Sequence, residues 1–172
     1  MNRTIIKLFL CLCIVTALPS YAYNTVHYYF RTVDIRNGLS QNSVNCIFQD
    51  KKGFMWFGTK DGLSRYDGLS FRIYNNENSN LGRNFITVLY EDSKGNIWVG
   101  TDGGLYIYNP IFDSLTEFNL VSDKGTVIRD FVTMIRCDEY SNLWISVENQ
   151  GLFCYNSCLL YTSPSPRDRS VS

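Results

Sequence analysis

The chain has 172 residues, of which 45% are hydrophobic, 15% aromatic and 19% charged. Sixteen basic residues balance sixteen acidic residues, so the formal net charge is zero. This is the composition of an ordinary globular protein, and it argues against a disordered chain, a collagen-like rod or a coiled coil. Because there is no excess of positive charge, nothing in the composition indicates a nucleic-acid partner for this segment.

Residues 1–22 have the pattern of a signal peptide. Arg3 and Lys7 give a positive start, residues 8–18 form an apolar run, and small residues stand before the expected cleavage point, at Ala22. We expect cleavage after Ala22 and export to the periplasm. The alternative is an uncleaved N-terminal anchor, although the apolar run is shorter than the about 20 residues of a membrane span.

Cleavage would change the charge and the cysteine count. It would leave 14 basic and 16 acidic residues, a net charge of −2, and four of the six cysteines. Those four lack paired Cys-x-x-Cys spacing, which disfavours zinc, and no cofactor is expected in this chain. An oxidising compartment permits disulfides, but nothing in the sequence pairs these residues, so we interpret them as small buried thiols. They are Cys46, Cys137, Cys154 and Cys158.

Internal repetition is the most informative feature of the sequence. Trp56, Trp98 and Trp144 are 42 and 46 residues apart, close to the about 40–50 residues of a propeller blade. An aspartate stands six residues before each tryptophan, a glycine or serine three before it, and Gly-Leu and a tyrosine follow it. We assign a structural role to the positions Asp50, Gly53, Trp56, Gly62, Tyr66, Asp92, Gly95, Trp98, Gly104, Tyr108, Asp138, Trp144, Gly151 and Tyr155.

Each repeat predicts a meander of four antiparallel strands. First strands are expected at residues 43–49, 85–91 and 131–137, and a tight turn then leads to a second strand that carries the tryptophan. Hairpin dipeptides lead into a third strand, and fourth strands are expected at 69–74 and 114–118. The predicted fold class is all-β: a partial β-propeller with about three four-stranded blades of a larger ring.

The third repeat departs from this pattern. Ser141 replaces the turn glycine and one extra residue precedes Gly151, which predicts a looser turn or a bulge at 148–150 and no fourth strand. The ending contains two prolines and no alternation, and it is expected to be a disordered, non-native tail; the alternative is a natural Ser/Pro-rich linker. The predicted organisation is signal peptide 1–22, strand-like lead-in 23–37, repeats 38–79, 80–125 and 126–157, and tail 158–172.

Residues 30–157 resemble the two-component regulator propeller family. The resemblance rests on the motif Asp-x-x-Gly-x-x-Trp-x-Gly-Thr, which is followed by Gly-Leu-x-x-Tyr. The resemblance implies the extracytoplasmic sensor of a hybrid two-component histidine kinase, which acts in signal transduction, phosphorelay and transcription regulation. It also implies a small-molecule or oligosaccharide ligand and a homodimer in the intact protein. Downstream segments outside this chain would anchor that protein in the inner membrane and carry its kinase.

The chain carries no catalytic motif of its own. The one histidine, His27, lies in a strand-like context and is expected at a surface or edge. There is no Gly-x-Ser-x-Gly motif and no phosphate-binding loop. The recurring aspartates are explained as turn residues, although a pair of glycosidase carboxyls is the alternative.

The repeated aromatic residues are expected to pack between blades, with a sugar-stacking platform as the alternative. Ligand contacts are more readily expected from polar residues that break the repeat. Two other functions stay open: a secreted propeller enzyme or lectin acting on glycans, and the sensor of another membrane signalling protein such as a diguanylate cyclase. The candidate ligand contacts are Arg65, Asn75, Asn76, Asn80 and Arg83.

Overall fold

The computed structural model describes residues 27–122, 125–156 and 162–163. The predicted signal peptide and most of the predicted tail therefore lie outside the described residues. The chain divides into a unit up to Thr32 and a second unit from Val33 onward. The described part of the first unit, residues 27–32, is exposed and has no regular structure, so the strand expected around His27 is not formed there.

The second unit begins with a short turn of 3-10 helix, η1 (Ile35–Asn37). Asp34 caps this helix: its side chain accepts a hydrogen bond from the backbone N–H of Arg36, and Oδ1 of Asn37 accepts one from the backbone N–H of Asp34. Such reciprocal capping satisfies two backbone donors that would otherwise have no partner. The lead-in was expected to be strand-like, and the structure shows this helix in its place.

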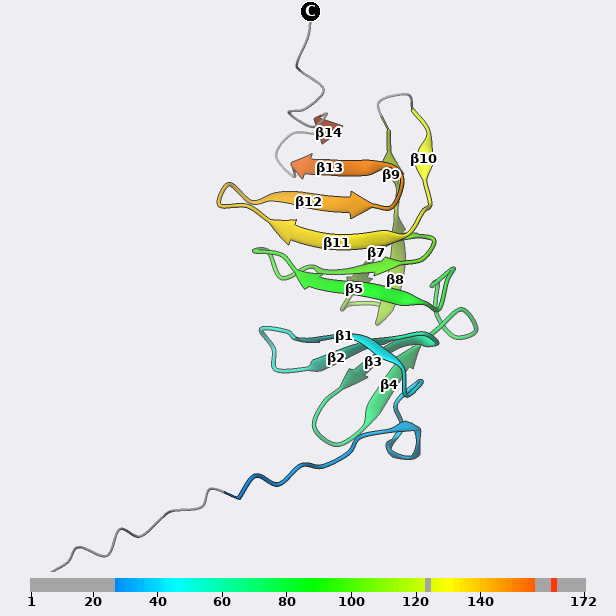
Figure 1. Cartoon of the computed structure of the whole chain (residues 1–172), viewed down its shortest axis with the longest axis vertical. Coiled ribbons are helices and arrows are strands. Elements are labelled where there is room, and N and C mark those ends of the chain that lie inside the picture. Colours follow the sequence, from blue (N-terminus) through cyan, green and yellow to red (C-terminus); the bar gives the residue numbers. More distant parts are fainter. Residues whose placement is uncertain (1–26, 123–124, 157–161, 164–172) are drawn as a thin grey trace, which may run out of the picture. The chain divides into compact units, whose positions relative to one another are not determined.

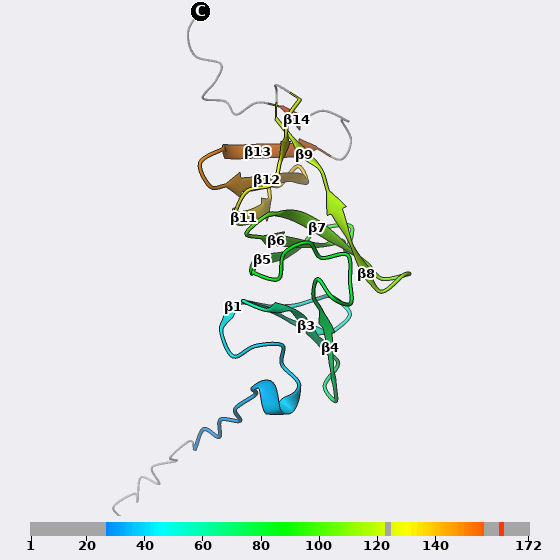
Figure 2. The same ribbon diagram turned by 90° about the vertical axis from the view of Figure 1, so that its right-hand side faces the viewer.

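Three four-stranded antiparallel sheets form most of the described part of the unit, and each follows chain order. Blade 1 contains β1 (Val44–Gln49), β2 (Met55–Thr59), β3 (Gly62–Tyr66) and β4 (Phe71–Tyr74). Blade 2 contains β5 (Ile86–Glu91), β6 (Ile97–Thr101), β7 (Gly104–Asn109) and β8 (Ser114–Phe118). Blade 3 contains β11 (Val132–Cys137), β12 (Asn142–Val147), β13 (Gly151–Asn156) and β14 (Thr162–Ser163). Figures 1 and 2 show the sheets stacked face to face, which confirms the predicted fold class.

A small hairpin between blades 2 and 3 was not predicted. It pairs β9 (Leu120–Val121) with β10 (Val127–Ile128). Leu120 and Ile128 are buried in the core between these two blades. Strands of two residues are too short to show an alternating pattern, so the sequence gives no clear signal for them.

One of the two predictions for the third repeat was wrong. Of the looser turn or bulge expected at 148–150, the structure shows the looser turn, because β12 and β13 pair without a shift down to Val147 and Gly151 and leave a longer loop between them. The extra residue lies in the hairpin loop, where Asn149 has φ 59°. A fourth strand was expected to be missing, but Thr162–Ser163 pairs with β13 as β14.

The other turn of the third repeat keeps the geometry of the first two repeats. Gly53 and Gly95 have φ of 92° and 83°, and Ser141 at the same position has φ 63°. All three residues are therefore in the left-handed region, which glycine occupies at little cost and serine does not. The substitution strains the backbone locally but does not change the path of the turn.

The blades bury their faces against one another. In the first interface Trp56 and Leu63 of blade 1 lie in one core with Ile97 and Tyr108 of blade 2. The second interface repeats this arrangement and includes Trp98, Leu105, Ile135 and Leu143. Burying one such large side chain contributes roughly 2–3 kcal/mol, so the sheet-to-sheet contacts stabilise the fold more than any single pairing.

The inner strands approach each other closely at a glycine. A β carbon at Gly100 would lie 2.6 Å from Cγ1 of Val88 and 2.9 Å from Cγ1 of Val132 in the next blade. Beside it, Oγ1 of Thr87 donates a 2.5 Å hydrogen bond to the backbone oxygen of Val132. The spacing of blades 2 and 3 therefore depends on the missing side chain at Gly100.

Replacing Gly100 with alanine is expected to lower the free energy of unfolding by about 1–3 kcal/mol, the usual cost of overpacking a core. Urea unfolding followed by tryptophan fluorescence measures this change. Ser146 occupies the equivalent position in blade 3, already has a β carbon, and is half-buried. Ser146→Ala is the control and is expected to change stability by less than about 0.5 kcal/mol. Equal losses in the two variants would contradict the role assigned to Gly100.

Candidate functional site

The turn between the first and second strands of each blade is built around an aspartate. In blade 1, Oδ1 of Asp50 accepts hydrogen bonds from the backbone of Lys52 at 3.0 Å and of Phe54 at 2.9 Å. Oδ2 of Asp50 accepts a 2.8 Å hydrogen bond from Nε1 of Trp56. One carboxylate therefore closes the turn and also fixes the tryptophan ring, which is fully buried.

The same arrangement recurs in the other two blades. Oδ2 of Asp92 accepts from Nε1 of Trp98 at 3.0 Å, and Oδ2 of Asp138 accepts from Nε1 of Trp144 at 3.0 Å. In each case Oδ1 accepts two backbone N–H groups of the turn. A group that is fully occupied in every repeat has a role in the scaffold, and none of these carboxylates is arranged as a catalytic pair.

Stability in acid is expected to depend on Asp138. Hydrogen bonds from Trp144, and then from Asn142, lower the pKa of this carboxyl to about 2. Since its pKa in the unfolded chain is about 3.9, the unfolded state binds the proton more readily. The stabilisation is present above about pH 4 and is lost as the pH falls toward about 2. Urea midpoints between these pH values should fall less steeply for Asp138→Asn than for the unchanged chain; an unchanged slope would contradict the shift.

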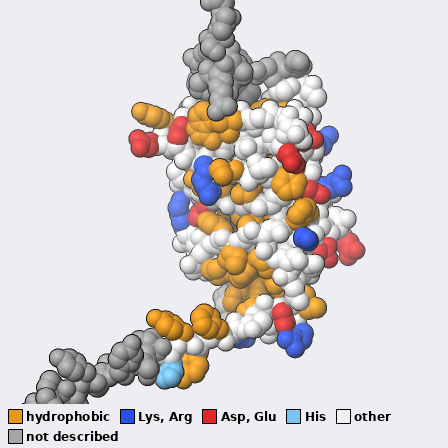
Figure 3. Space-filling view, in the orientation of Figure 1, with side chains coloured by type: hydrophobic (Ala, Val, Ile, Leu, Met, Phe, Trp, Pro, Cys, Tyr) orange, Lys and Arg blue, Asp and Glu red, His pale blue; other side chains and the backbone are white. Residues whose placement is uncertain are grey.

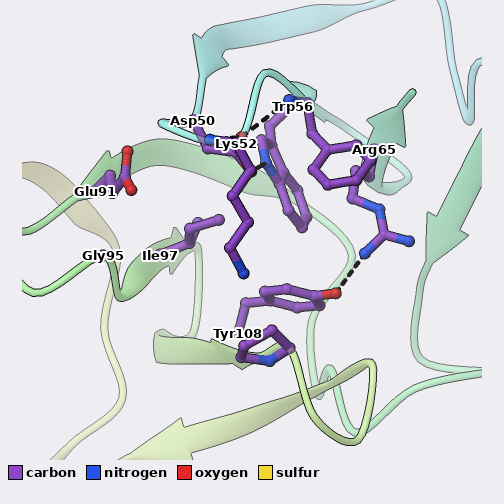
Figure 4. Close-up of a pocket in the computed structure, with 10 residues that line it drawn as sticks. Asp50, Lys52, Trp56, Arg65, Glu91, Gly95, Ile97 and Tyr108 are labelled. Atoms are coloured by element: carbon purple, nitrogen blue, oxygen red, sulfur yellow. Dashed lines mark hydrogen bonds between the residues drawn. The ribbon is translucent and has the colours of Figure 1, made fainter. Parts of the chain in front are cut away.

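A cavity of about 240 Å³ lies between blades 1 and 2, beside the Asp50 turn. Figure 4 shows the Lys52 side chain extending into it toward the ring of Tyr108, while Trp56 forms part of its wall. The cavity combines apolar rings with both signs of charge. Its lining residues are Asp50, Lys52, Phe54, Trp56, Arg65, Glu91, Gly95, Ile97, Tyr108 and Pro110.

Arg65 is held at the edge of this cavity by a polar and aromatic network. Its Nη1 donates to the hydroxyl of Tyr108 and, at 3.1 Å, to Asp113. The guanidinium carbon lies 4.9 Å from the ring centre of Phe54 and 5.8 Å from that of Trp56, within the range of cation–π attraction.

Asp113 is the common acceptor of the network. It accepts 2.5 Å and 2.7 Å hydrogen bonds from the hydroxyls of Tyr74 and Tyr108, and Arg72 lies 3.3 Å away. Burial acts to raise the pKa of Asp113, but the tyrosine hydrogen bonds and the two arginines outweigh it, and the pKa is lowered. Burial, and then the hydrogen bond to Asp113, raise the pKa of Tyr74 and Tyr108, so both hydroxyls stay protonated as donors.

Among the five candidate ligand contacts from the sequence, only Arg65 lines this cavity. Asn75 and Asn76 lie in the turn after β4, where Asn76 bonds to Asn84. Arg83 packs beside Gly103, and Asn80 is exposed elsewhere. The sequence reasoning missed other cavity residues, although a comparison of repeats carries a signal for two of them: Phe54 stands where blade 2 has Asn96, and Glu91 where blade 3 has Cys137.

Other chemistry has no support in the described ranges. Cys46, Cys137 and Cys154 are free thiols there, while Cys158 lies outside them. Burial raises the pKa of Cys46 to about 11, which keeps it a thiol at neutral pH. Within the same ranges, no three His, Cys, Asp or Glu side chains group as metal ligands, and no helix has the length and apolar character to cross a membrane.

The fold, together with the aspartate turn that recurs in each blade, defines this chain as a series of β-propeller blades. Residues 38–61 and 80–103 match the sequence profile of the two component regulator propeller family. These segments coincide with the first and second repeats and include both Asp-x-x-Gly turns. These two segments are therefore similar to repeats of this family, which confirms the resemblance drawn from the residues.

Relatives of known structure agree with this match. The chain is similar to the extracellular domain of BT3049 from B. thetaiotaomicron, described as a hybrid two component system, with 26% identity and a TM-score of 0.69 over 81% of this chain. It is also similar to the extracellular domain of BT4673 from the same organism, with 30% identity and a TM-score of 0.62 over 72% of this chain. This chain spans only 20% and 18% of those two chains.

A curated relative points in the same direction. Over 50 residues, 29% of this chain, the sequence is 48% identical to Histidine kinase P4 of Formosa agariphila. Those residues span 4% of that kinase. The blades of this chain are thus similar to parts of the extracellular domains of two hybrid two component systems and to a segment of a histidine kinase.

Proposed function

We propose that this chain is part of the extracytoplasmic, ligand-sensing region of a hybrid two-component histidine kinase. The observation that carries the proposal is the similarity to extracellular domains of such systems, at 26% and 30% identity over most of this chain. In this proposal the protein is exported to the periplasm, and the intact protein is anchored in the inner membrane by segments outside this chain.

The part played by these blades is binding and scaffolding. The cavity beside Lys52 and Arg65 offers polar groups above an apolar floor, which is the usual character of a small-molecule site. A ligand there changes the output only if it binds one arrangement of a sensor homodimer more tightly than the other. Autophosphorylation, phosphorelay and gene regulation would follow in the downstream segments.

The gene that encodes these repeats provides the first test. Downstream of the codon for Asn156 we expect further blades, a span of about 20 apolar residues, and a histidine kinase core. A stop codon directly after a closed propeller would overturn the proposal in favour of a secreted lectin or enzyme. A cyclase domain after the membrane span would assign the sensor to another output.

A second test addresses location and signalling. The full-length gene product is expected in the inner-membrane fraction, with the epitope of a tag in the exposed β12–β13 loop accessible only after the outer membrane is opened. Autophosphorylation in membrane vesicles should change when the inducing growth substrate is supplied. A cytoplasmic tag, or a constant rate under every condition, would contradict the sensing role.

A further inference from the structure

Equivalent positions in successive repeats line two cavities of unequal size. The cavity between blades 1 and 2 measures about 240 Å³, and its counterpart between blades 2 and 3 about 20 Å³. Both are lined by the aspartate, lysine and tryptophan of one repeat and the tyrosine of the next. These are Asp50, Lys52, Trp56 and Tyr108 in the first cavity and Asp92, Lys94, Trp98 and Tyr155 in the second. Because these residues are the same in type, the scaffold alone does not account for the larger cavity.

Gly95 of the larger cavity corresponds to Ser141 in the smaller one, and three larger side chains of its lining also break the repeat. The scaffold does not require them, since the next repeat folds in the same way with other residues there. Positions that vary on a constant scaffold are where binding groups usually lie. The three pairs are Phe54 against Asn96, Arg65 against Ile107, and Glu91 against Cys137. Arg65 adds a charge where the next blade has an apolar side chain.

Two cationic residues that line this cavity have hydrogen-bond donors with no acceptor in the described part of the chain. Only Nη1 of Arg65 donates hydrogen bonds within the part of the chain that the structure describes, which leaves Nε and Nη2 without acceptors there. The ammonium of Lys52 likewise makes no hydrogen bond or ion pair with any described residue, and it points into the cavity in Figure 4. Half-buried cationic donors usually have a partner, so the unused donors of the half-buried Arg65 are suited to an external acceptor, and the exposed Lys52 ammonium adds a second positive charge at the cavity.

The acidic groups near the cavity do not supply that acceptor. Both oxygens of Asp50 are occupied by N–H groups of its own turn. Oε2 of Glu91 accepts a 3.0 Å hydrogen bond from the backbone of Lys51, and its carboxylate lies apart from the Lys52 ammonium in Figure 4. Asp113 already accepts from two tyrosines in addition to Arg65.

We infer that the cavity binds a small organic anion: one ring that carries a carboxylate. The carboxylate would accept from the ammonium of Lys52, with the guanidinium of Arg65 as a second positive charge beside the cavity, while the ring packs on Tyr108 and Phe54. The volume is below the about 300–1,000 Å³ of sites for drug-sized ligands, so a single ring fits, either free or at the end of a longer molecule. An aromatic acid and an acidic sugar share this chemistry. The inference rests on the proposed function, because it names the ligand class of the same site.

Calorimetric titration of the full-length gene product with benzoate and with glucuronate tests this inference. Their uncharged counterparts, benzamide and glucose, report the contribution of the carboxylate. At least one acid is expected to bind at concentrations up to about 10 mM, and about tenfold more tightly than its counterpart. Which acid binds identifies the ring. Failure of both acids to bind, or equal affinity for acid and counterpart, would overturn the inference.

Matched variants locate the site. Arg65→Ile introduces the residue found at the same position in blade 2, and Lys52→Met removes the ammonium; each is expected to weaken the acid about tenfold or more. Arg65→Lys keeps the charge and should retain part of the affinity, which separates loss of binding from loss of fold. Lys94→Met, at the equivalent turn beside the small cavity, is expected to leave affinity unchanged. A loss as large in Lys94→Met would overturn the assignment.

The binding measurement tests the anion site and the signalling measurement tests the proposed sensing role, so either claim can be contradicted while the other stands. Acid binding that never alters autophosphorylation would contradict the proposed sensing role and leave the site assignment standing. A kinase that responds to its inducer while neither acid binds would contradict the anion site alone.

Discussion

Replacing Asp50 with alanine is expected to lower the free energy of unfolding by about 3 kcal/mol, because three N–H donors lose their acceptor at once. The indole N–H of Trp56 contributes most, since the ring is fully buried and water cannot replace the lost oxygen. The backbone donors of Lys52 and Phe54 lie in a partly exposed turn and cost less. Urea unfolding at neutral pH, followed by tryptophan fluorescence, measures the loss.

Two further variants show whether burial sets this cost. Asp50→Asn can still close the turn through Oδ1, but its amide nitrogen cannot accept from Trp56, so an intermediate loss is expected. Asp138→Ala removes the three equivalent hydrogen bonds in blade 3 and one more from Nδ2 of Asn142. A smaller loss is still expected, because Trp144 is only half-buried and water can reach the donors that are left. Equal losses for the alanine variants of Asp50 and Asp138 would show that the turn, and not the buried tryptophan, sets the cost.

The sequence predicts the blades well because the same pattern of residues occurs in all three repeats. The first strands were expected at 43–49, 85–91 and 131–137, and each begins one residue later in the structure. Failures occur where the pattern is not repeated. The β9–β10 hairpin and β14 have strands of two residues, which carry no periodic signal. Shifts of register near the start of each first strand were also not predicted, since they depend on how neighbouring strands twist.

The candidate site was harder to predict from the sequence than the fold. Arg65 was identified because it breaks the repeat, but its neighbour Asp113 lies 48 residues away in a loop of the next blade. Such a contact depends on how two sheets stack, and no spacing within one repeat encodes it. The cavity becomes visible only when blades 1 and 2 are placed face to face.

The chain on its own is expected to self-associate, because both end blades expose apolar side chains that other repeats bury. Ile47 on blade 1 is 62% exposed, while Leu89 and Ile135 at the same repeat position are 7% and 0% exposed. Leu152 on blade 3 is 45% exposed, while its counterparts, Leu63 and Leu105, are 0% and 1% exposed. Figure 3 shows hydrophobic side chains gathered over blade 1. Uncovered faces and unpaired strand edges of this kind favour association.

Size-exclusion chromatography of residues 23–157 measures this directly, and oligomers or aggregates are expected at micromolar concentration. Ile47→Lys combined with Leu152→Lys places a charge on each uncovered face and is expected to shift the protein toward monomer. Ile111→Lys is the control, since Ile111 is 83% exposed in the β7–β8 loop, outside both faces, and the elution volume should not change. An unmodified segment that elutes as a monomer and melts cooperatively would show that these two faces do not need a covering surface.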